Sequence, residues 1–434
     1  MDEEKFECII VGAGPAGCAA ALVLAKAGVE VLLVERGETA GSKNMTGGVL
    51  YSSPLNKILP EFWKDAPIER PITRRRISYI SSDSEIAFEF SNSKFRDPPH
   101  NNSFSILRGK FDKWFCEKVE EAEGMVIPET TVDELIMKDG KCVGVKARRE
   151  DGEMYSDVVI VAEGANSLLA RNAGLRERFK PEGMMSCAKE VLELSEEKVK
   201  ERFCLEDNDG TAMQFFGKVF NGMLGGGFLY TNKNSISIGI AMSISDMIEK
   251  NANPNEVLEA FKAHPSVNRY IRGAEMQEYS AHMIPEYGYN YMPQIVGDGV
   301  LLTGDSAGFV NTSLYHEGSN LALMSGILAA ETVISAKEKG DFSKETLSLY
   351  RQKLENSFVF KDLYRYRNFT SFLHSNPEFF STYPEFAIKA VNRYFTIDER
   401  PKSQGIKDIR KIFKEDIRLF KLIKQLNGAR KALI

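Results

Sequence analysis

The chain has 434 residues, with 56 Lys and Arg against 61 Asp and Glu, so its formal net charge is −5. A content of 43% hydrophobic and 27% charged residues is that of an ordinary globular protein and excludes a fibrous or disordered chain. A single core stops growing at about 250–300 residues, which predicts at least two domains. The uncharged stretches 219–232 and 318–330 are shorter than the roughly 18–20 apolar residues of a bilayer span. The N-terminus is acidic where a secretory signal is basic, so we expect a cytoplasmic protein.

The cysteines and histidines are spaced too widely for a metal centre. The sequence has five histidines and no C-x-x-C motif, whereas zinc ribbons and iron–sulfur clusters need ligands grouped within a few residues. We therefore predict no metal site, buried thiols, and an organic cofactor for any redox chemistry. The six cysteines are Cys8, Cys18, Cys116, Cys142, Cys187 and Cys204.

A dinucleotide-binding pattern opens the chain. The apolar segment 6–11 leads into Gly12-Ala13-Gly14-Pro15-Ala16-Gly17, then into a helix pattern over 18–27 and a strand pattern over 29–34. Gly12 permits the tight turn, Gly14 lets a pyrophosphate approach the backbone, and Gly17 lets helix and strand pack closely. The phosphates would bind at the helix N-terminus, beside Pro15 and Ala16.

An acidic residue follows the second predicted strand at the position this pattern requires. Glu35 lies 18 residues after Gly17, where a carboxylate accepts both hydroxyls of an adenosine ribose and repels a 2′-phosphate. We include the adjacent Arg36 among the expected cofactor contacts. The alternative is a glycine-rich turn that binds no ligand.

A second motif near residue 300 indicates which dinucleotide is bound. The apolar run 300–303 ends in Gly304-Asp305 and is followed by a helix pattern over 318–336. Asp305 can accept a hydrogen bond from a ribityl or ribose hydroxyl in the middle of a long cofactor. The helix that begins at Gly318-Ser319-Asn320 would direct its N–H groups at a flavin carbonyl. This arrangement predicts FAD rather than NAD.

The motifs together resemble the FixC-type electron-transfer flavoprotein:quinone oxidoreductases, a branch of the glutathione-reductase-type FAD fold that also holds the geranylgeranyl reductases. The likeness runs from about residue 5 to about residue 395. It rests on the two motifs above and on the segments 41–51, 225–230, 284–286, 304–311, 317–322 and 357–363.

The resemblance implies an α/β fold with a Rossmann-like FAD domain, an inserted antiparallel-sheet domain and a helical C-terminal region. The expected FAD domain is discontinuous, and the inserted domain would bind the quinone. The expected boundaries are 1–75, 105–175 and 295–340 for the FAD domain, 76–104 and 176–294 for the quinone domain, and 341–434 for the helical region.

The same resemblance implies that FAD carries electrons from a two-subunit electron-transfer flavoprotein to a membrane quinone. The chain lacks a second G-x-G-x-x-G motif and has no cysteine pair near Gly41–Gly48, so a disulfide reductase is not expected. Longer relatives carry cluster-binding cysteines that this chain lacks, which implies a separate, small ferredoxin-like iron–sulfur subunit. The alternatives are a geranylgeranyl-type reductase, a flavin monooxygenase, or a flavin-bearing structural subunit of an electron-transfer complex.

Further cofactor contacts are expected from the resemblance. Lys43 and Asn44, with Gly47 in the same segment, would lie beside flavin N5 or O4, unless the segment is a solvated turn. Arg108, at the start of a predicted amphipathic helix, would bind the pyrophosphate. Gly164 follows a predicted strand at Glu163-Gly164, where many relatives have Asp-Gly, so any contact made by the longer Glu163 must be shifted.

The quinone would be protonated and held by three candidate catalytic residues, namely Tyr230, His282 and His316. Phe228 and Tyr230 are two residues apart in a strand pattern, so they point to one face and could stack on a quinone ring. Gly225-Gly226-Gly227 just before them predicts close approach of a planar ligand or of another backbone. The two histidines are candidates for proton delivery, and each could equally have a structural role.

The last segment of the chain is strongly basic. Residues 401–434 hold ten Lys and Arg against three acids, a net charge of +7, which leaves −12 on the rest of the chain. We expect one amphipathic helix that binds either an acidic partner or the inner face of the cell membrane, with a packed terminal helix as the alternative. Nucleic-acid binding is not expected, because the remainder is acidic.

Overall fold

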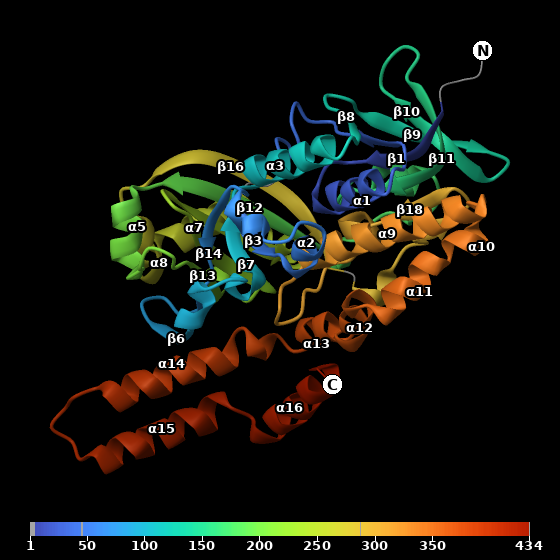
Figure 1. Cartoon of the computed structure of the whole chain (residues 1–434). Helices are drawn as coiled ribbons and strands as arrows, with labels where there is room; N and C mark the ends of the chain where they lie inside the picture. Colours follow the sequence, from blue (N-terminus) through green and yellow to red (C-terminus); the bar gives the residue numbers. More distant parts are fainter. Residues whose placement is uncertain (1–4, 45–46, 287, 434) are drawn as a thin grey trace. The chain divides into compact units, whose positions relative to one another are not determined.

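The structure is a computed structural model that describes residues 5–44, 47–286 and 288–433, and the chain divides into two units (Figure 1). The chain passes between the units several times. The first unit holds the described parts of Met1–Pro71, Asp97–Met184 and Met283–Tyr364, and the second those of Ile72–Arg96, Met185–His282 and Arg365–Ile434.

The first unit is built on an eight-stranded sheet formed by β1 (Lys5–Val11), β2 (Val31–Val34), β8 (Met125–Ile127), β9 (Val132–Lys138), β10 (Lys141–Ala147), β11 (Glu153–Val161), β17 (Val296–Gly297) and β18 (Val300–Leu302). Strand β1 pairs in parallel with β2 on one side and with β11 on the other. Strand β2 pairs in parallel with β8, and β11 pairs in parallel with β18. The other three strands are antiparallel additions. The parallel strands are apolar and buried over 8–11, 31–34, 158–161 and 300–302, as expected for a sheet that is covered on both faces.

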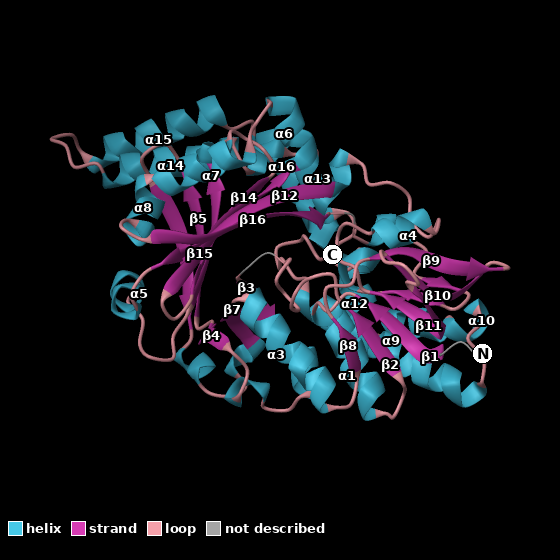
Figure 2. Ribbon diagram, turned by 90° about the horizontal axis from the view of Figure 1, so that it is seen from above, coloured by secondary structure: helices cyan, strands magenta, loops and turns pink. Residues whose placement is uncertain are grey.

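The helices of this unit are α1 (Pro15–Lys26), α2 (Ser53–Ile58), α3 (Arg108–Glu121), α4 (Leu168–Asn172), α9 (Ser319–Lys339), α10 (Lys344–Leu347), α11 (Leu349–Asn356) and α12 (Phe358–Arg365). Helix α1 packs against α9 and α3 next to the parallel strands (Figure 2). A small three-stranded sheet completes the unit, with β3 (Gly48–Tyr51), β7 (Ser103–Ile106) and β4 (Ile68–Pro71).

Helix α9 is long and apolar enough to cross a membrane, which the short uncharged stretches in the sequence had not led us to expect. Within the described part of the chain it is the one helix that meets this description. However, 78% of its apolar 18-residue stretch is buried, and the helix packs against α1. The helix is therefore accounted for as the core helix of the first unit.

The second unit is built on a seven-stranded sheet in the order β16-β12-β15-β14-β13-β5-β6 (Figure 2). The pairs β12–β15, β15–β14, β14–β13 and β5–β6 are antiparallel, and the pair β13–β5 is parallel. The strands are β5 (Arg74–Ile80), β6 (Glu85–Ser91), β12 (Met184–Glu193), β13 (Thr211–Gly217), β14 (Gly225–Thr231), β15 (Ser235–Ser243) and β16 (Glu275–Pro285).

Four short helices pack on one face of this sheet and form its core, namely α5 (Glu196–Phe203), α6 (Ile244–Lys250), α7 (Pro254–Ala263) and α8 (Pro265–Ile271). The ring of Phe261 in α7 lies 5.2 Å from that of Phe215 and 5.6 Å from that of Phe220. A side chain caps each of these helices at its start: Ser195 caps α5, Ser243 caps α6, Asn253 caps α7 and His264 caps α8.

The C-terminal helices of the second unit are α13 (Phe369–His374), α14 (Thr382–Phe395), α15 (Lys402–Asp416) and α16 (Leu419–Leu433). The prediction of a single basic helix is wrong, because two helices meet at Ile417. Ile417 has extended backbone angles (φ −113°, ψ 118°), which end the helical backbone there. Its side chain is 5% exposed and is therefore buried. Helices α14 and α15 lie side by side (Figure 1), with Phe386 and Phe413 5.4 Å apart and Arg393 bonded to Asp408 at 2.8 Å.

Candidate cofactor site and comparisons with known proteins

The glycines of the first motif have the geometry that a bound dinucleotide requires. Gly12 has a φ of +104°, which a side chain rarely tolerates, and a Cβ there would lie 2.5 Å from the carbonyl oxygen of Ala162. A Cβ on Gly17 would lie 1.9 Å from the carbonyl oxygen of Gly12, so the helix and the turn are in direct contact. A Cβ on Gly14 would meet nothing nearer than the Arg108 guanidinium at 3.8 Å. The space above Gly14 is therefore open for a ligand.

Helix α1 begins in this turn without a side-chain cap. Its N-cap is Gly14, its first residue is Pro15, and Ala16 and Gly17 follow in the first turn. The N–H groups at a helix start have no partner within the helix, and the helix dipole adds a partial positive charge there. An anionic group that approaches Gly14 is thus met by several donors at once.

Glu35 at the end of β2 is buried beside this turn. Its Oε2 accepts the backbone N–H of Ala13 at 2.9 Å, and its Oε1 accepts that of Gly37 at 2.7 Å. These bonds fix the carboxylate, and each oxygen has a further lone pair for a ribose hydroxyl. The adjacent Arg36 is exposed and remains only a predicted contact.

Arg108 is held over the glycine turn by Asp112, one turn later in α3. The Arg108 Nε donates to Asp112 at 2.8 Å and its Nη2 at 2.6 Å, and Asp112 is 1% exposed. Asn44 donates its side-chain N–H to the same carboxylate at 2.8 Å, so this amide is engaged by the protein rather than unpaired. The carboxylate of Asp112 therefore orients two of the predicted cofactor contacts.

The second motif brings another carboxylate toward the same guanidinium. Asp305 follows β18 and Gly304, and the charges of Arg108 and Arg176 both act on it. Burial raises the pKa of Asp305 to about 6, and the two guanidinium groups only partly offset that rise. Asp305 can thus accept a hydroxyl hydrogen bond as a carboxylate or donate one as an acid.

Helix α9 also begins without a side-chain cap, at Gly318. A Cβ on Gly318 would meet no atom within 4 Å, so the helix start faces open space. The Ser319 hydroxyl accepts the backbone N–H of Tyr51 at 2.9 Å, and the side-chain oxygen of the buried Asn320 has no hydrogen-bond partner. A buried acceptor without a partner is costly unless a ligand donates to it.

The residues present fit a bound FAD. The open spaces above Gly14 and Gly318, the uncapped starts of α1 and α9, and the unpartnered oxygen of Asn320 form a set of sites that a long dinucleotide with a flavin would fill. Gly164 adds a further open position, because a Cβ there would meet no atom within 4 Å.

Two residues of this site were missed from the sequence. One is Asp112, which accepts hydrogen bonds from Arg108. The other is Arg176, which is 9% exposed and donates to the Ser306 carbonyl oxygen at 2.6 Å. For Asp112 a signal existed, since an acid four residues after an arginine is a helical ion pair. Arg176 had none, because its partner lies 130 residues away in the sequence.

Glu163, at which we expected a shifted cofactor contact, caps a helix instead. Its two carboxylate oxygens accept the N–H groups of Leu169 and Ala170 at the start of α4, each at 2.9 Å. Burial raises its pKa, against the lowering effect of these backbone bonds. Glu163 therefore serves to fix the turn that carries Gly164.

The segment 41–48 is only partly described. Lys43 is exposed and Gly47 is buried, while Met45 and Thr46 of the predicted flavin-side segment lie outside the described residues. A Cβ on Gly41, whose φ is +87°, would lie 2.5 Å from the Arg108 carbonyl oxygen. The start of the segment is thus in contact with the start of α3, and the roles of Lys43 and Gly47 remain predictions.

His316 lies in an exposed loop that leads into α9. The loop is closed by Glu317, which exchanges two backbone hydrogen bonds with Asn311 at 2.8 and 3.0 Å. The Glu317 carboxylate accepts the side-chain N–H groups of Asn311 at 3.1 Å and Asn320 at 2.9 Å. His316 therefore sits on a loop whose two ends are fixed to the start of α9.

Tyr230 and His282 belong to the second unit, whereas His316 belongs to the first. Tyr230 in β14 stacks on Phe228 with ring centroids 5.1 Å apart, as expected for residues on one face of a strand. His282 in β16 is half-buried. The proposed catalytic roles of these three residues remain predictions.

The glycines of β14 make room for the protein itself, which agrees with the second of the two alternatives, the close approach of another backbone. A Cβ on Gly226 would lie 3.0 Å from the ring of Phe216, and one on Gly227 would lie 2.4 Å from the ring of Phe261. Gly225, with a φ of +130°, approaches the backbone of Ala241. The close approach of another backbone was expected, but the two aromatic neighbours were not.

The expectation that every cysteine is buried is wrong for one of the six. Cys204 is exposed, and the other five are buried. In the described ranges 5–44, 47–286 and 288–433, no group of three or more His, Cys, Asp or Glu side chains has an arrangement that would hold a metal ion.

Solved structures share this fold. A geranylgeranyl bacteriochlorophyll reductase-like protein from Thermoplasma acidophilum superimposes with a TM-score of 0.74 over 98% of this chain and 100% of its own, at 20% identity. The flavin-dependent brominase Bmp2 matches with a TM-score of 0.63 over 95% and 100%, at 16% identity. At these identities the likeness shows the fold alone. Fold and site geometry define the class, a FAD-dependent oxidoreductase.

Sequence comparisons give the family. Protein FixC of Azorhizobium caulinodans is 43% identical over 96% of this chain and 96% of its own. The Escherichia coli protein named "Probable electron transfer flavoprotein-quinone oxidoreductase YdiS" is 42% identical over 92% and 93%. Residues 7–207 match the Glucose inhibited division protein A family, and residues 369–434 match the ETF-QO/FixC family C-terminal domain. The chain belongs to the FixC family of electron-transfer flavoprotein:quinone oxidoreductases, which confirms the predicted family, fold class and FAD cofactor.

Proposed function

We propose that this protein oxidises reduced electron-transfer flavoprotein and reduces a quinone at a membrane surface. The observation that carries the proposal is the open cradle above Gly14, flanked by Glu35, Arg108 and Asp305, in a chain of the FixC family. The sequence has no second nucleotide-binding motif, so a protein donor is the simplest source of electrons. When bound, FAD supplies the capacity to accept and release electrons.

The residues of the first unit would hold the cofactor in an extended form. Glu35 would accept the ribose hydroxyls, the start of α1 and Arg108 would bind the pyrophosphate, and Asp305 would contact the ribityl chain. The N–H groups at the start of α9 would stabilise negative charge on the ring system. Asp112 acts through Arg108 and is a positioning residue.

We place the quinone on the sheet face of the second unit that carries Phe228 and Tyr230. Paired residues across a sheet point to one face, and the register aligns Phe228 with Gly239 and Lys189 on neighbouring strands. A Cβ on Gly239 would lie 2.5 Å from the Cζ of Phe228, so the Phe228 ring occupies the space that a side chain at Gly239 would fill. A flat aromatic surface suits a quinone ring, and Tyr230 and His282 would offer hydrogen-bonding groups.

The membrane surface would be reached by α16. One face of this helix exposes Leu419, Phe420, Ile423 and Leu426, at 55%, 84%, 50% and 52% of their surface. Large apolar side chains so exposed in a helix with basic neighbours are typical of a helix that lies in a bilayer interface. A separate ferredoxin-like subunit is part of the same proposal, since the scattered cysteines of this chain would not bind a cluster.

The proposal is tested with the FAD-loaded protein, chemically reduced electron-transfer flavoprotein and a soluble quinone analogue. We expect the flavin absorbance of the protein to bleach on mixing and to return when the quinone is added. The protein stripped of FAD is the control. If the donor is not oxidised, and the chemically reduced protein instead passes its electrons to a prenyl lipid, the protein is a geranylgeranyl-type reductase and the proposal is wrong.

A further inference from the structure

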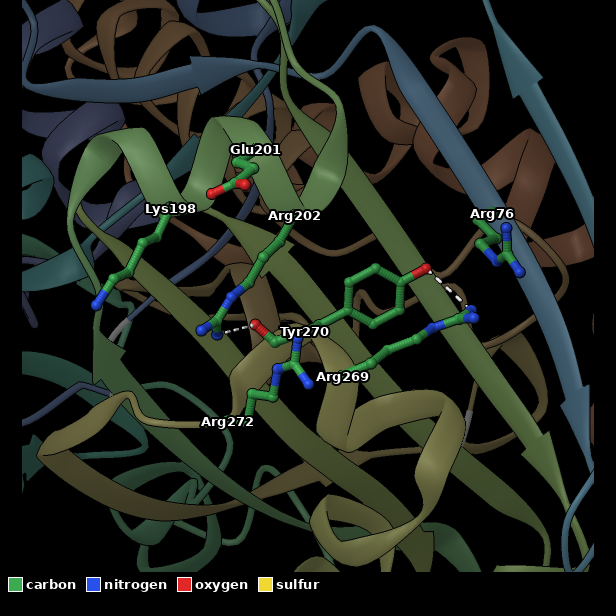
Figure 3. A pocket seen from close by; sticks show the side chains of 7 residues that line it. All are labelled: Arg76, Lys198, Glu201, Arg202, Arg269, Tyr270 and Arg272. Carbon is green, nitrogen blue, oxygen red and sulfur yellow. Dashed lines mark hydrogen bonds between the residues drawn. The ribbon is translucent and has the colours of Figure 1, made fainter.

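A basic pocket lies in the second unit, and none of the residues assigned to cofactor or quinone line it. Its volume is about 670 Å³, within the roughly 300–1,000 Å³ of small-molecule sites. Side chains from β5, α5 and α8, and from the residues after α8, point toward it (Figure 3). Its lining holds five cations, namely Arg76, Lys198, Arg202, Arg269 and Arg272, together with Tyr270 and a single carboxylate, Glu201.

Two of the arginines are fixed in place by one carboxylate outside the lining. Glu85 in β6 accepts from Arg76 at 2.9 Å and from Arg269 at 2.9 Å. Burial by itself raises the pKa of Glu85, but its hydrogen bonds from Ser78 and Arg76 lower it overall. The guanidinium of Arg269 also lies 4.9 Å from the centre of the Tyr270 ring. One side of the pocket is therefore rigid before any ligand arrives.

The other two arginines form no hydrogen bond or salt bridge to a carboxylate of the described residues, although the charge of the neighbouring Glu201 acts on Arg202. Arg202 donates to the backbone oxygen of Tyr270 at 2.9 Å, and neither Arg202 nor Arg272 forms a salt bridge there. Burial, and next the charge of Arg272, lower the pKa of Arg202. Two guanidinium groups that repel each other across a pocket are stabilised by a shared anion.

We propose that this pocket binds the phosphate group of a small anion. Guanidinium groups present paired N–H donors that match the oxygens of a phosphate, and the two arginines that bond to no carboxylate of the described residues would supply them. Lys198 is exposed at the edge of the pocket and adds one positive charge. Arg76 and Arg269, which Glu85 holds in place, add to the positive electrostatic potential of the pocket. The phosphate belongs either to a soluble compound or to a lipid headgroup.

The test measures binding of inorganic pyrophosphate to the FAD-loaded protein by calorimetry, in chloride buffer at constant ionic strength. We expect Arg202→Gln and Arg272→Gln each to weaken binding by about tenfold, the usual effect of losing one hydrogen bond to a charged group. Arg149→Gln is the matched control, because Arg149 is exposed on a hairpin of the first unit. FAD content and melting temperature without anion report whether each variant is folded.

A second arm uses sedimentation with vesicles of phosphatidylcholine, with and without phosphatidylglycerol. Loss of pyrophosphate binding alone assigns the site to a soluble phosphate compound, and loss of phosphatidylglycerol-dependent sedimentation assigns it to a lipid headgroup. Both outcomes support the pocket. It is overturned if the wild-type protein binds neither probe, or if Arg272→Gln, which alters an exposed side chain, binds both as the wild type does.

Discussion

Arg108 and Asp112 form a paired hydrogen bond within one turn of α3, with N–O distances of 2.8 and 2.6 Å. Asp112 is almost fully buried, so its charge requires the guanidinium beside it. As a result the protein itself positions Arg108 near Gly14. The Arg108 Nη2 lies 3.8 Å from the point where a Cβ on Gly14 would be. The cofactor would not have to order this side chain, which favours tight binding.

The pair predicts a non-additive effect on cofactor affinity. Arg108→Gln should weaken FAD binding by about 10–100-fold, since it removes a bond to a charged group. Asp112→Asn should weaken it less, and the double variant should be no worse than Arg108→Gln, because Asp112 acts through the arginine. Flavin fluorescence on titration of the FAD-free protein measures all three. Additive losses would show that Asp112 contacts the cofactor independently.

The two motif glycines should respond in opposite ways to alanine. Gly14→Ala adds a methyl group to open space, so the FAD-free protein should keep its unfolding free energy while FAD binding is lost. Gly17→Ala places a methyl 1.9 Å from the Gly12 oxygen and should cost about 3 kcal/mol of stability. Urea unfolding and bound-flavin content separate the two effects. Equal destabilisation by both variants would contradict the open cradle.

Glu35→Gln tests the ribose contact. The amide can replace only part of the acceptor capacity that Glu35 uses toward Ala13, Gly37 and the ribose, so FAD affinity should fall by about tenfold or more. Glu38→Gln is the control, because Glu38 is exposed in the same loop and the substitution removes the same negative charge. It should leave FAD affinity unchanged. Parallel affinity losses in both variants would indicate a general charge effect instead.

The pH dependence of the FAD-free protein should report Asp305. Its pKa is about 6 in the folded protein against an ordinary 3.8, so between these values the folded state binds more protons than the unfolded state. Stability should therefore fall as pH rises from about 4 to 6, by up to about 3 kcal/mol from this group. Asp305→Asn should lose this part of the slope in urea unfolding. An unchanged slope would show that Asp305 is not the group responsible.

Membrane attachment should depend on α16. Ile423→Asn removes an apolar side chain from the exposed face of the helix and should reduce sedimentation with anionic vesicles. Ile248→Asn is the matched control, since Ile248 is 65% exposed in α6. If both variants sediment as the wild type does, α16 is not the membrane contact.

The parts of the site that the sequence predicted are those whose partners are close in the chain. Gly12, Gly14 and Gly17 act within one turn, and Glu35 is a fixed distance beyond them, so spacing alone identifies their roles. Arg176 was missed because its partner, the Ser306 carbonyl oxygen, is 130 residues away in the sequence and is brought close only when the chain folds. For Glu163 the sequence indicated only that any cofactor contact must be shifted, and its side chain accepts backbone N–H groups at the start of α4.

The family resemblance implied the fold class, and the strand and helix patterns predicted its opening βαβ unit, whereas the C-terminal region did not follow from its periodicity. Residues 402–433 keep a helical pattern throughout, yet burial of Ile417 divides them into α15 and α16. Likewise, the glycines in β14 indicated close packing but not its partner. The rings of Phe216 and Phe261 come from other elements, which a strand pattern does not reveal.

The clamp that Glu317 forms with Asn311 and Asn320 separates the tip of its loop from the start of α9. Leu314, 62% exposed, lies at that tip, between Asn311 and Glu317. A fluorophore attached there through an engineered thiol would sense an approaching redox partner while the helix start stays in place. Only Cys204 would have to be removed first, because the other five native thiols are buried.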